Sequence, residues 1–206
     1  MNTVAKSKFS VLSMTQIAVC TALLCVSAWM SIALPFIEVA FTLQVLMVLL
    51  VSLLLKPVYA LTAQVLYTLL GVVGLPVFSK FASGVGAIVS SRTGGFIIGF
   101  IIASFLVSLL KGSKIIDFII APLPASLLKY SNIIRYIIVS IFVGLPAIYI
   151  PGILGYMLYT GADLISATVT LTSVFILLDI VKCIIASFAA VLIKKALNAA
   201  NLGFEE

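Results

Sequence analysis

Long apolar runs separated by short polar stretches constrain the fold of this chain more than any other feature of its sequence. Hydrophobic residues make up 64% of the 206 residues, and charged residues only 9%. A soluble chain of this length has about a quarter of its residues charged, so this one could not cover a surface that faces water. The sequence therefore predicts an all-α integral membrane protein.

The apolar runs are expected to form six transmembrane helices in a single integral membrane domain, residues 1–206. No repeat of about 20–50 residues is visible, and the first run is longer than the apolar part of a signal peptide, so we expect it to be retained. Pro35 is expected to end the first span, and Pro146 and Pro151 to kink or break the fifth. The expected spans cover residues 11–34, 41–55, 59–73, 94–110, 133–149 and 166–193.

The positions of the twelve Lys and Arg residues predict how the helices are oriented. With both termini in the cytoplasm, nine basic residues lie in cytoplasmic segments and two, Lys80 and Arg92, in outer segments, while Lys182 lies within a span. The positive-inside rule therefore favours an N-in/C-in topology. Because the cations are scattered between apolar blocks and form no basic face, we expect no nucleic-acid partner.

Asp179 and Lys182 are the most unusual residues, because both lie deep in the last apolar run. Each costs about 2.5–3.5 kcal/mol at the centre of a membrane helix. Their i, i+3 spacing places them on one helix face, where they can pair, and that face must point into the bundle or a wet cavity. We interpret the pair as a ligand-binding element, since ionisable residues in a membrane are functional by default. The alternative is a structural ion pair that ties helices together.

Arg92 directly precedes an expected helix that starts near Gly94. The first N–H groups of a helix are free and its dipole is positive at that end, so a guanidinium beside them can receive a carboxylate. The polar residues expected to face inward include Gln44, Arg92, Asp179 and Lys182. Their charges suit a small anionic or zwitterionic organic ligand with amide-like groups.

Other kinds of chemistry have little support in the sequence. The chain contains no His, which excludes His-based zinc sites and a Ser-His-Asp triad within it. No Walker A motif is present, and no metal-ligand spacing is found. Cys20, Cys25 and Cys183 lie in apolar runs and form no disulfide framework. We therefore expect no enzyme activity, no metal site and no cofactor.

Four sequence blocks carry a resemblance to a known family. They are FTLQ at 41–44, YTLLGVVGLPVFS at 67–79, TGGFIIGF at 93–100 and LDIVK at 178–182. With these blocks in this order, the chain resembles the BioY family, the biotin-specific substrate-binding (S) components of energy-coupling factor (ECF) transporters. The resemblance implies a six-helix membrane bundle with a vitamin site that opens outward, in the plasma membrane of a bacterium.

The resemblance also implies roles for single residues. Asp179 and Lys182 match the family's Asp-x-x-Lys pair and would bind the ureido ring of biotin, which offers two N–H donors and a carbonyl acceptor. Arg92 would bind the valerate carboxylate through a bidentate contact. Further candidates for ligand contact are Phe78, as an apolar wall, together with Gln44 and Ser79.

Ala18 and Ala22 form a small-xxx-small face in the first run, which lets two helices approach closely. Packing inside the bundle explains such a face as readily as a partner does. In S components a surface of this kind meets a membrane coupling subunit, which works with a pair of ATPases. The resemblance therefore implies that subunit and the ATPase pair as partners within the lipid bilayer, with biotin as the transported ligand.

The expected function is to capture biotin on the outer side and to deliver it with an ATP-driven ECF module. One alternative is an S component for another vitamin. A second is a stand-alone ion-coupled transporter, which needs coupling carboxylates and usually an internal repeat, and neither is visible. A third is a structural subunit in which Asp179 and Lys182 clamp helices together and no small ligand binds.

Overall fold

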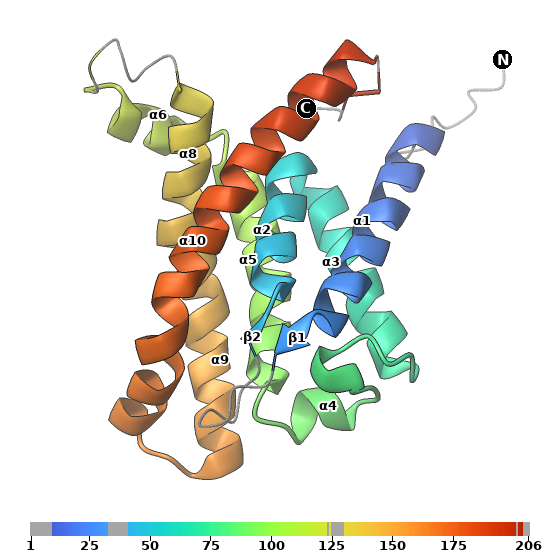
Figure 1. Ribbon diagram of the computed structural model, residues 1–206, viewed down its shortest axis with the longest axis vertical. Helices are drawn as coiled ribbons and strands as arrows, with labels where there is room; N and C mark the ends of the chain where they lie inside the picture. The colour runs from blue at the N-terminus through green and yellow to red at the C-terminus, as the bar shows by residue number, and fades with distance from the viewer. Residues whose placement is uncertain (1–9, 33–40, 123, 125–129, 201, 204–206) are drawn as a thin grey trace, which may run out of the picture.

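Apolar helices dominate the structure, a computed structural model that describes residues 10–32, 41–122, 124, 130–200 and 202–203. The long helices run roughly along the long axis of the molecule, with short elements at the two ends (Figure 1). In chain order the elements are α1 (Val11–Trp29), β1 (Ser31–Ile32), β2 (Phe41–Thr42), α2 (Gln44–Leu54), α3 (Pro57–Val72), η1 (Ser79–Phe81), α4 (Gly86–Val89), α5 (Gly94–Leu110), α6 (Lys114–Ile120), α8 (Ser131–Val139), η2 (Ser140–Gly144), α9 (Leu145–Thr160) and α10 (Leu164–Ala199).

Helix α5 lies at the centre of the bundle and contacts α2, α3 and α9. Its closest neighbour is α9, because two glycines remove the side chains that would separate the backbones. A side chain at Gly95 would collide with the carbonyl oxygen of Pro151, and a Cβ at Gly99 would come within 2.7 Å of the Ile148 oxygen. This Gly-xxx-Gly spacing sets the close crossing of the two helices.

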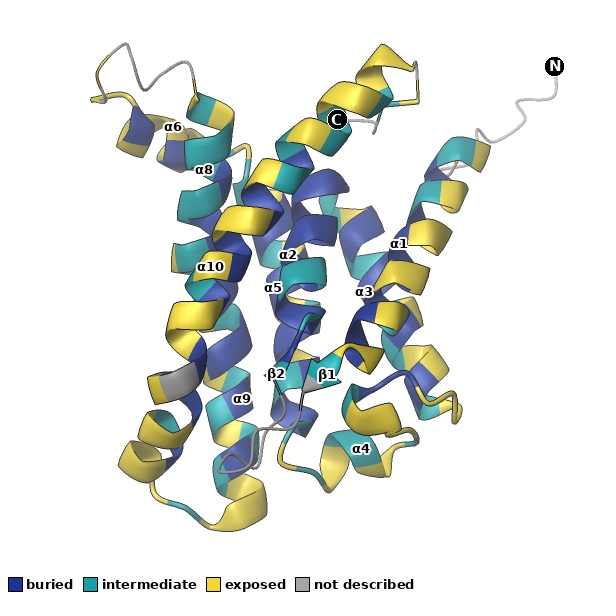
Figure 2. Cartoon of the chain, viewed as in Figure 1, coloured by how far each residue is buried: buried dark blue, intermediate teal, exposed yellow. Residues whose placement is uncertain are grey.

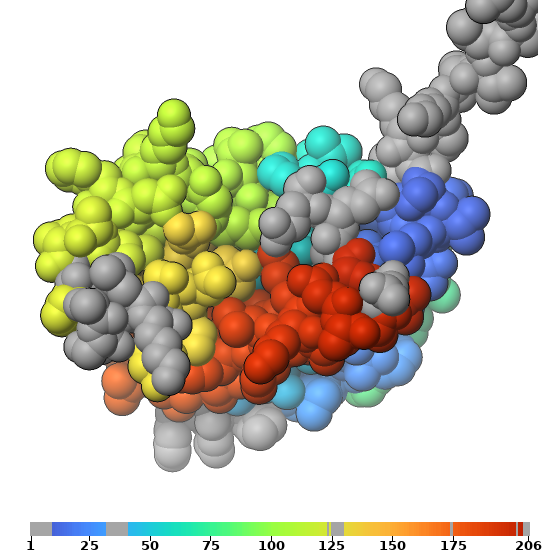
Figure 3. Space-filling view, turned by 90° about the horizontal axis from the view of Figure 1, so that it is seen from above, coloured from blue at the N-terminus to red at the C-terminus, as the bar shows by residue number. Residues whose placement is uncertain are grey.

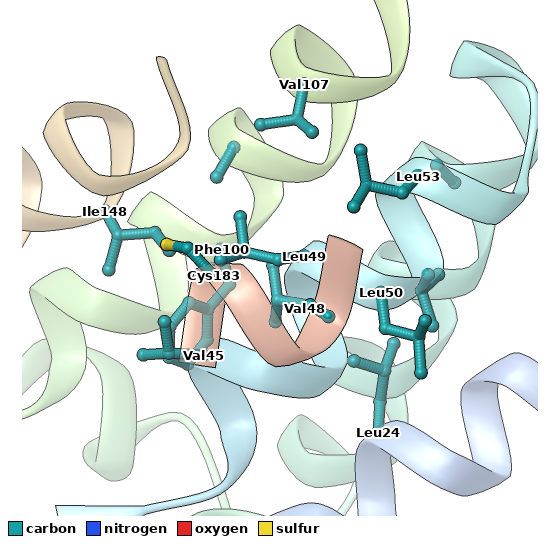
Figure 4. Close-up of a cluster of buried hydrophobic side chains, with 14 of the residues drawn as sticks. Leu24, Val45, Val48, Leu49, Leu50, Leu53, Phe100, Val107, Ile148 and Cys183 are labelled. Carbon is teal, nitrogen blue, oxygen red and sulfur yellow. The ribbon is translucent and has the colours of Figure 1, made fainter. Parts of the chain in front are cut away.

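Helix α2 is enclosed by its neighbours, and nine of its eleven residues are buried. Figure 4 shows its apolar side chains packed against residues from α1, α5, α9 and α10, among them Leu24, Phe100 and Ile148. A helix of this length measures about 16 Å, against about 30 Å for the hydrocarbon core of a bilayer. The surrounding helices therefore shield the ends of α2 from lipid.

The outer faces of the bundle carry many exposed apolar side chains, as Figure 2 shows for α1 and α10. Within the described residues, three helical stretches are long and apolar enough to cross a membrane: Val11–Trp29, Ser131–Thr160 and Phe175–Ala199. A fourth is added if Gly94–Leu110 and Lys114–Ile120, bent by 68°, form one span. These are the properties of a multi-pass membrane protein.

The first expected span is shorter in the structure. Helix α1 ends at Trp29, and β1 pairs antiparallel with β2 immediately afterwards. Pro35, the expected end of this span, lies outside the described residues.

The fifth expected span is longer, because its prolines do not break it and the helix runs over residues 131–160. Pro146 directly follows the π-helical turn η2, and a local π adjustment of this kind lets a helix continue past a residue without an N–H. Pro151 lies within α9, which a membrane helix tolerates when its neighbours satisfy the freed backbone groups.

The segment between α3 and α5, residues 73–93, is a structured loop that contains η1 and α4. Trp29 ties this loop to the end of α1. Its indole N–H donates to the carbonyl oxygen of Pro76 at 2.7 Å, and its ring stacks on Phe81 with centroids 6.2 Å apart. The loop is thereby held beside the β1–β2 pair, where it contributes Ser79 to the site described next.

Candidate ligand-binding site

A small pocket lies at the end of the bundle that carries β2, η1 and the start of α5, hereafter the pocket end. Its free volume is about 60 Å³. Aromatic and aliphatic side chains of α5 and α10 supply apolar walls, among them Phe96, Phe100, Leu171 and Phe175. Polar groups converge on it from β2, α2, η1, α9 and α10 and from Thr93, the residue before α5: Thr42, Gln44, Ser79, Thr93, Tyr149, Asp179 and Lys182.

The two charged residues of α10 form an ion pair at this pocket. The Lys182 Nζ atom lies 2.7 Å from Asp179 Oδ1, and the two residues are only 5% and 4% exposed. Burial of either charge alone would be strongly unfavourable, so the opposite charge beside it offsets the cost of burial. Their helix face points into a cavity of the bundle and not toward lipid, as their spacing predicted.

Residues from other elements hold this ion pair in position. The Tyr149 hydroxyl of α9 donates to Asp179 Oδ2 at 2.8 Å, and the ring of Phe96 packs edge-on against Tyr149 at 6.1 Å. The Lys182 ammonium lies 4.0 Å from the centroid of the Phe41 ring, a cation–π contact. The pair is therefore fixed by three separate elements.

The pair can still bind a ligand in this arrangement. The contacts described for Lys182 use one of its three N–H donors, and each carboxylate oxygen of Asp179 can accept a further hydrogen bond. A ligand with an N–H donor beside a carbonyl acceptor would find both partners within one face of α10. This arrangement selects ligands by the positions of their hydrogen-bonding groups. A ligand whose groups do not match would leave buried donors or acceptors without partners.

Gln44 lines the pocket, whereas Phe78 lies behind it. The Gln44 side-chain amide donates to the Tyr67 hydroxyl at 2.7 Å, and the Tyr67 ring meets Phe78 edge-on with centroids 5.7 Å apart. Phe78 is 2% exposed and packs against Gly71. Its ring thus supports Tyr67 and is not among the lining residues, so its contact with a ligand stays a prediction.

Arg92 lies just before α5, as expected, and is separated from it by Thr93, but its side chain does not line the pocket. It is exposed, and its guanidinium carbon lies 5.8 Å from the centroid of the Tyr159 ring on α9. Its neighbour Thr93 does line the pocket. The guanidinium therefore stands beside the pocket, outside its lining.

Ala18 and Ala22 lie on the outer face of α1, where both are exposed. No described element covers them, so packing inside the bundle does not account for this small-residue face.

Sequence reasoning missed Tyr149, Thr42 and Phe41. Tyr149 carries a hydroxyl within an apolar run, and a polar group in a membrane helix is a signal that could have been used. Phe41 and Thr42 stand in the FTLQ block at 41–44, which could have marked them. Their contacts at the pocket depend on where β2 lies in the fold.

A family model described as the BioY family matches residues 2–199 of this chain. Among similar proteins, the "Biotin transporter BioY" of Thermotoga maritima is 46% identical over 90 residues, which cover 44% of this chain and 52% of that protein. The "Probable biotin transporter BioY" of Pyrococcus horikoshii is 39% identical over 93 residues, which cover 45% and 56%. The matches thus span about half the length of these curated relatives.

A solved structure resembles almost the whole chain. It is described as the S-component for biotin from an ECF-type ABC transporter, and it matches with a TM-score of 0.75 over 89% of this chain and 90% of that one. The sequences are 22% identical. The likeness shows that this chain has the S-component fold.

Proposed function

Because this chain belongs to the BioY family, we propose that it is the substrate-binding subunit of a biotin importer. It captures biotin on the outer side and delivers it with an ATP-driven ECF module. The observation that carries the proposal is the buried Asp179–Lys182 pair at a pocket of the bundle. The expectation that the chain is not an enzyme agrees with its membership of this family.

The ureido ring of biotin is the part that suits this ion pair. A ureido N–H donates to the Asp179 carboxylate, while Lys182 donates to the ureido carbonyl. The hydroxyl of Tyr149 holds Asp179 in place for this contact. Gln44 and Ser79, which also line the pocket, are proposed as further polar contacts, and the thiophane ring lies against the aromatic walls.

The valerate chain of biotin runs out of the pocket past Thr93 toward Arg92. The exposed guanidinium then forms a charge-assisted contact with the carboxylate. The free space in the pocket is small, about 60 Å³, and the proposal includes a movement of the segments at the pocket end that admits biotin. A ring such as Phe78, which now supports Tyr67, becomes an apolar wall only after that movement.

We place the pocket end on the outer side of the plasma membrane of a bacterium, with six spans and both termini in the cytoplasm. The support is the distribution of charge, since most of the basic residues that the structure describes lie toward the other end of the bundle. The whole chain then forms one integral membrane domain, residues 1–206.

The proposed partners are a membrane coupling subunit and its pair of ATPases. The exposed face of α1 with Ala18 and Ala22 is the surface that we assign to the coupling subunit, because small residues let a second helix approach closely. Replacing both by Leu should separate the chain from the coupling subunit in a pull-down and leave biotin binding intact.

Calorimetry on the purified chain with biotin tests the proposal. Saturable binding is expected, and Asp179→Asn and Lys182→Ala should each weaken it by about 1–3 kcal/mol, because a buried partner is left unsatisfied. Asp163→Asn is the matched control, since Asp163 lies at the exposed start of α10. No heat with biotin would overturn the function, and displacement by thiamine, riboflavin or pantothenate would point to another vitamin.

A further inference from the structure

A large groove lies at the end of the bundle opposite the pocket, hereafter the basic end. Its volume is about 800 Å³. It is formed where the end of α2, the end of α5, the start of α8 and the last part of α10 meet. Figure 3 looks onto this end and shows the last part of α10 beside α8, with α6 next to them.

This groove is separate from the ligand pocket. Thr93, which lines the pocket, and Lys111, which lines the groove, stand 18 positions apart at opposite ends of α5. At 1.5 Å per residue this separation is about 27 Å, close to the thickness of the hydrocarbon core of a bilayer. A ligand in the groove therefore lies near the opposite membrane surface from the pocket.

The groove is lined by cations from four parts of the chain. They are Lys56, Lys111, Arg135, Lys194 and Lys195. Among the described residues that line the groove there is no Asp or Glu, and the carboxylate beside it, Asp117, pairs with Arg135. The scattered positions of these residues along the sequence predicted no basic face, but in the structure they converge on one hollow and give it a positive potential.

Lys111 shows that part of this charge has a structural role. Its ammonium donates to the carbonyl oxygens of Ser52 and Leu53 at 3.0 and 2.9 Å, where α2 ends. Lys194 lies 5.6 Å from the centroid of the Tyr136 ring, and Lys195 is exposed. The exposed Lys195 is thus the groove cation whose loss should disturb the packing of the bundle least.

A second, apolar groove of about 400 Å³ borders the same helix ends. On α5, Leu110 lines the apolar groove and the next residue, Lys111, lines the basic one. On α8, Arg135 lines the basic groove and Ile138 the apolar one, which Phe142 of the following π-helical turn η2 also lines. Along the continuous helix over residues 131–160, these three residues are spaced three and four positions apart and therefore lie along one side.

We propose that the two grooves together bind an anionic phospholipid. The phosphate headgroup lies among Lys56, Arg135, Lys194 and Lys195, and Asn132 and Asn198, which also line the groove, can donate to its oxygens. An acyl chain follows α8 into the apolar groove. A lipid is favoured over a free anion or an acidic peptide because its acyl chain suits the apolar groove that borders the basic one, and neither of the other two carries such a chain.

Native mass spectrometry of the full chain tests this proposal. The protein is mixed with equal amounts of dioleoyl-phosphatidylglycerol and dioleoyl-phosphatidylcholine, which differ in headgroup charge and not in acyl chains. We expect a bound lipid enriched in phosphatidylglycerol. The preference should fall about fivefold in Lys195→Gln and further in Lys194→Gln/Lys195→Gln, since each surface cation adds about 1 kcal/mol to the binding of an anionic lipid. Lys80→Gln, an exposed lysine at the pocket end, is the charge-matched control.

A competition arm separates the sources of the anion. Inorganic phosphate at a large excess over lipid should not displace phosphatidylglycerol, because it lacks an acyl chain. The proposal is overturned if both lipids bind equally, if Lys80→Gln loses as much preference as Lys195→Gln, or if phosphate or an acidic peptide displaces the lipid. If a variant fails to fold, the wild-type chain still tests the proposal, because its preference for phosphatidylglycerol must fall as the salt concentration rises.

Discussion

The pocket end and the basic end of this bundle use charge in opposite ways. At the pocket, Asp179 and Lys182 are buried and neutralise each other. At the other end, cations surround an open groove with no carboxylate among its described lining residues. A buried ion pair interacts strongly with a ligand and holds a fixed geometry. Charges that water reaches interact more weakly with a ligand, and salt screens them. The first arrangement suits the selection of one ligand, and the second suits the attraction of a class of anions.

The largest expected effect comes from removing one half of the buried pair. Asp179→Ala leaves the Lys182 ammonium without its partner in the bundle, so the free energy of unfolding should fall by about 3–5 kcal/mol. Biotin binding should be lost as well. Thermal unfolding in detergent and calorimetry measure the two effects.

The double variant Asp179→Leu/Lys182→Met separates a ligand site from a helix clamp. It replaces the pair with apolar side chains, so most of the stability should return, whereas biotin binding should not. If the double variant bound biotin as the wild type does, the pair would be structural only.

Tyr149→Phe is expected to have the next largest effect. It removes the hydroxyl that donates to Asp179 and keeps the ring that packs against Phe96. A hydrogen bond to a charged group contributes about 1.5 kcal/mol or more, so the dissociation constant of biotin should rise about tenfold. Tyr156→Phe, on the same helix but outside the lining of the pocket, should leave it unchanged. Equal losses in both variants would indicate general damage to α9.

Salt should distinguish the two ends directly. Biotin methyl ester lacks the carboxylate proposed to meet Arg92, so its binding reports on the buried pair alone. Its affinity should change less than about twofold between about 0.05 M and about 0.5 M NaCl, because buried charges are hardly screened. The preference for anionic lipid should drop severalfold over the same range. A strong salt dependence of the methyl ester would mean that the pair is open to solvent.

The smallest expected effect concerns Asp163, an exposed charge that belongs to neither end's ligand site. Its carboxylate accepts hydrogen bonds from the backbone N–H groups of Ile165 and Ser166 at the start of α10. Hydrogen bonds from Ser166, side chain first and backbone second, lower the pKa of Asp163 from its ordinary value of 3.8.

A lowered pKa means that the stabilisation is fully present above pH 3.8 and is lost as the pH falls through the lowered value. Asp163→Ala should therefore reduce Tm slightly at neutral pH, and the gap to the wild type should narrow on acidification below pH 3.8. If the difference in Tm between the variant and the wild type stayed constant down to the lowest pH measured, the charge of Asp163 would not stabilise the start of α10.

Much of the fold and part of the site could be predicted from the sequence. The helix at 94–110 was predicted at both ends, because hydropathy changes sharply at Arg92 and Lys111. The ends of the fifth span could not be predicted from the sequence, because the helix continues past its prolines. The π turn η2 and the neighbouring helices make this possible. Arg92 was placed correctly before α5, yet its contact with Tyr159 depends on how α9 ends.

By itself, the sequence determined that the chain is a bundle of apolar helices and that Asp179 and Lys182 share one buried face. Both conclusions rest on local properties, hydropathy and the period of the helix. Only the tertiary structure decided that Tyr149 reaches Asp179 across 30 residues and that cations from four segments surround one groove. The physical reason is that such contacts depend on how closely helices cross, which at α5 and α9 is set by glycine backbones meeting each other.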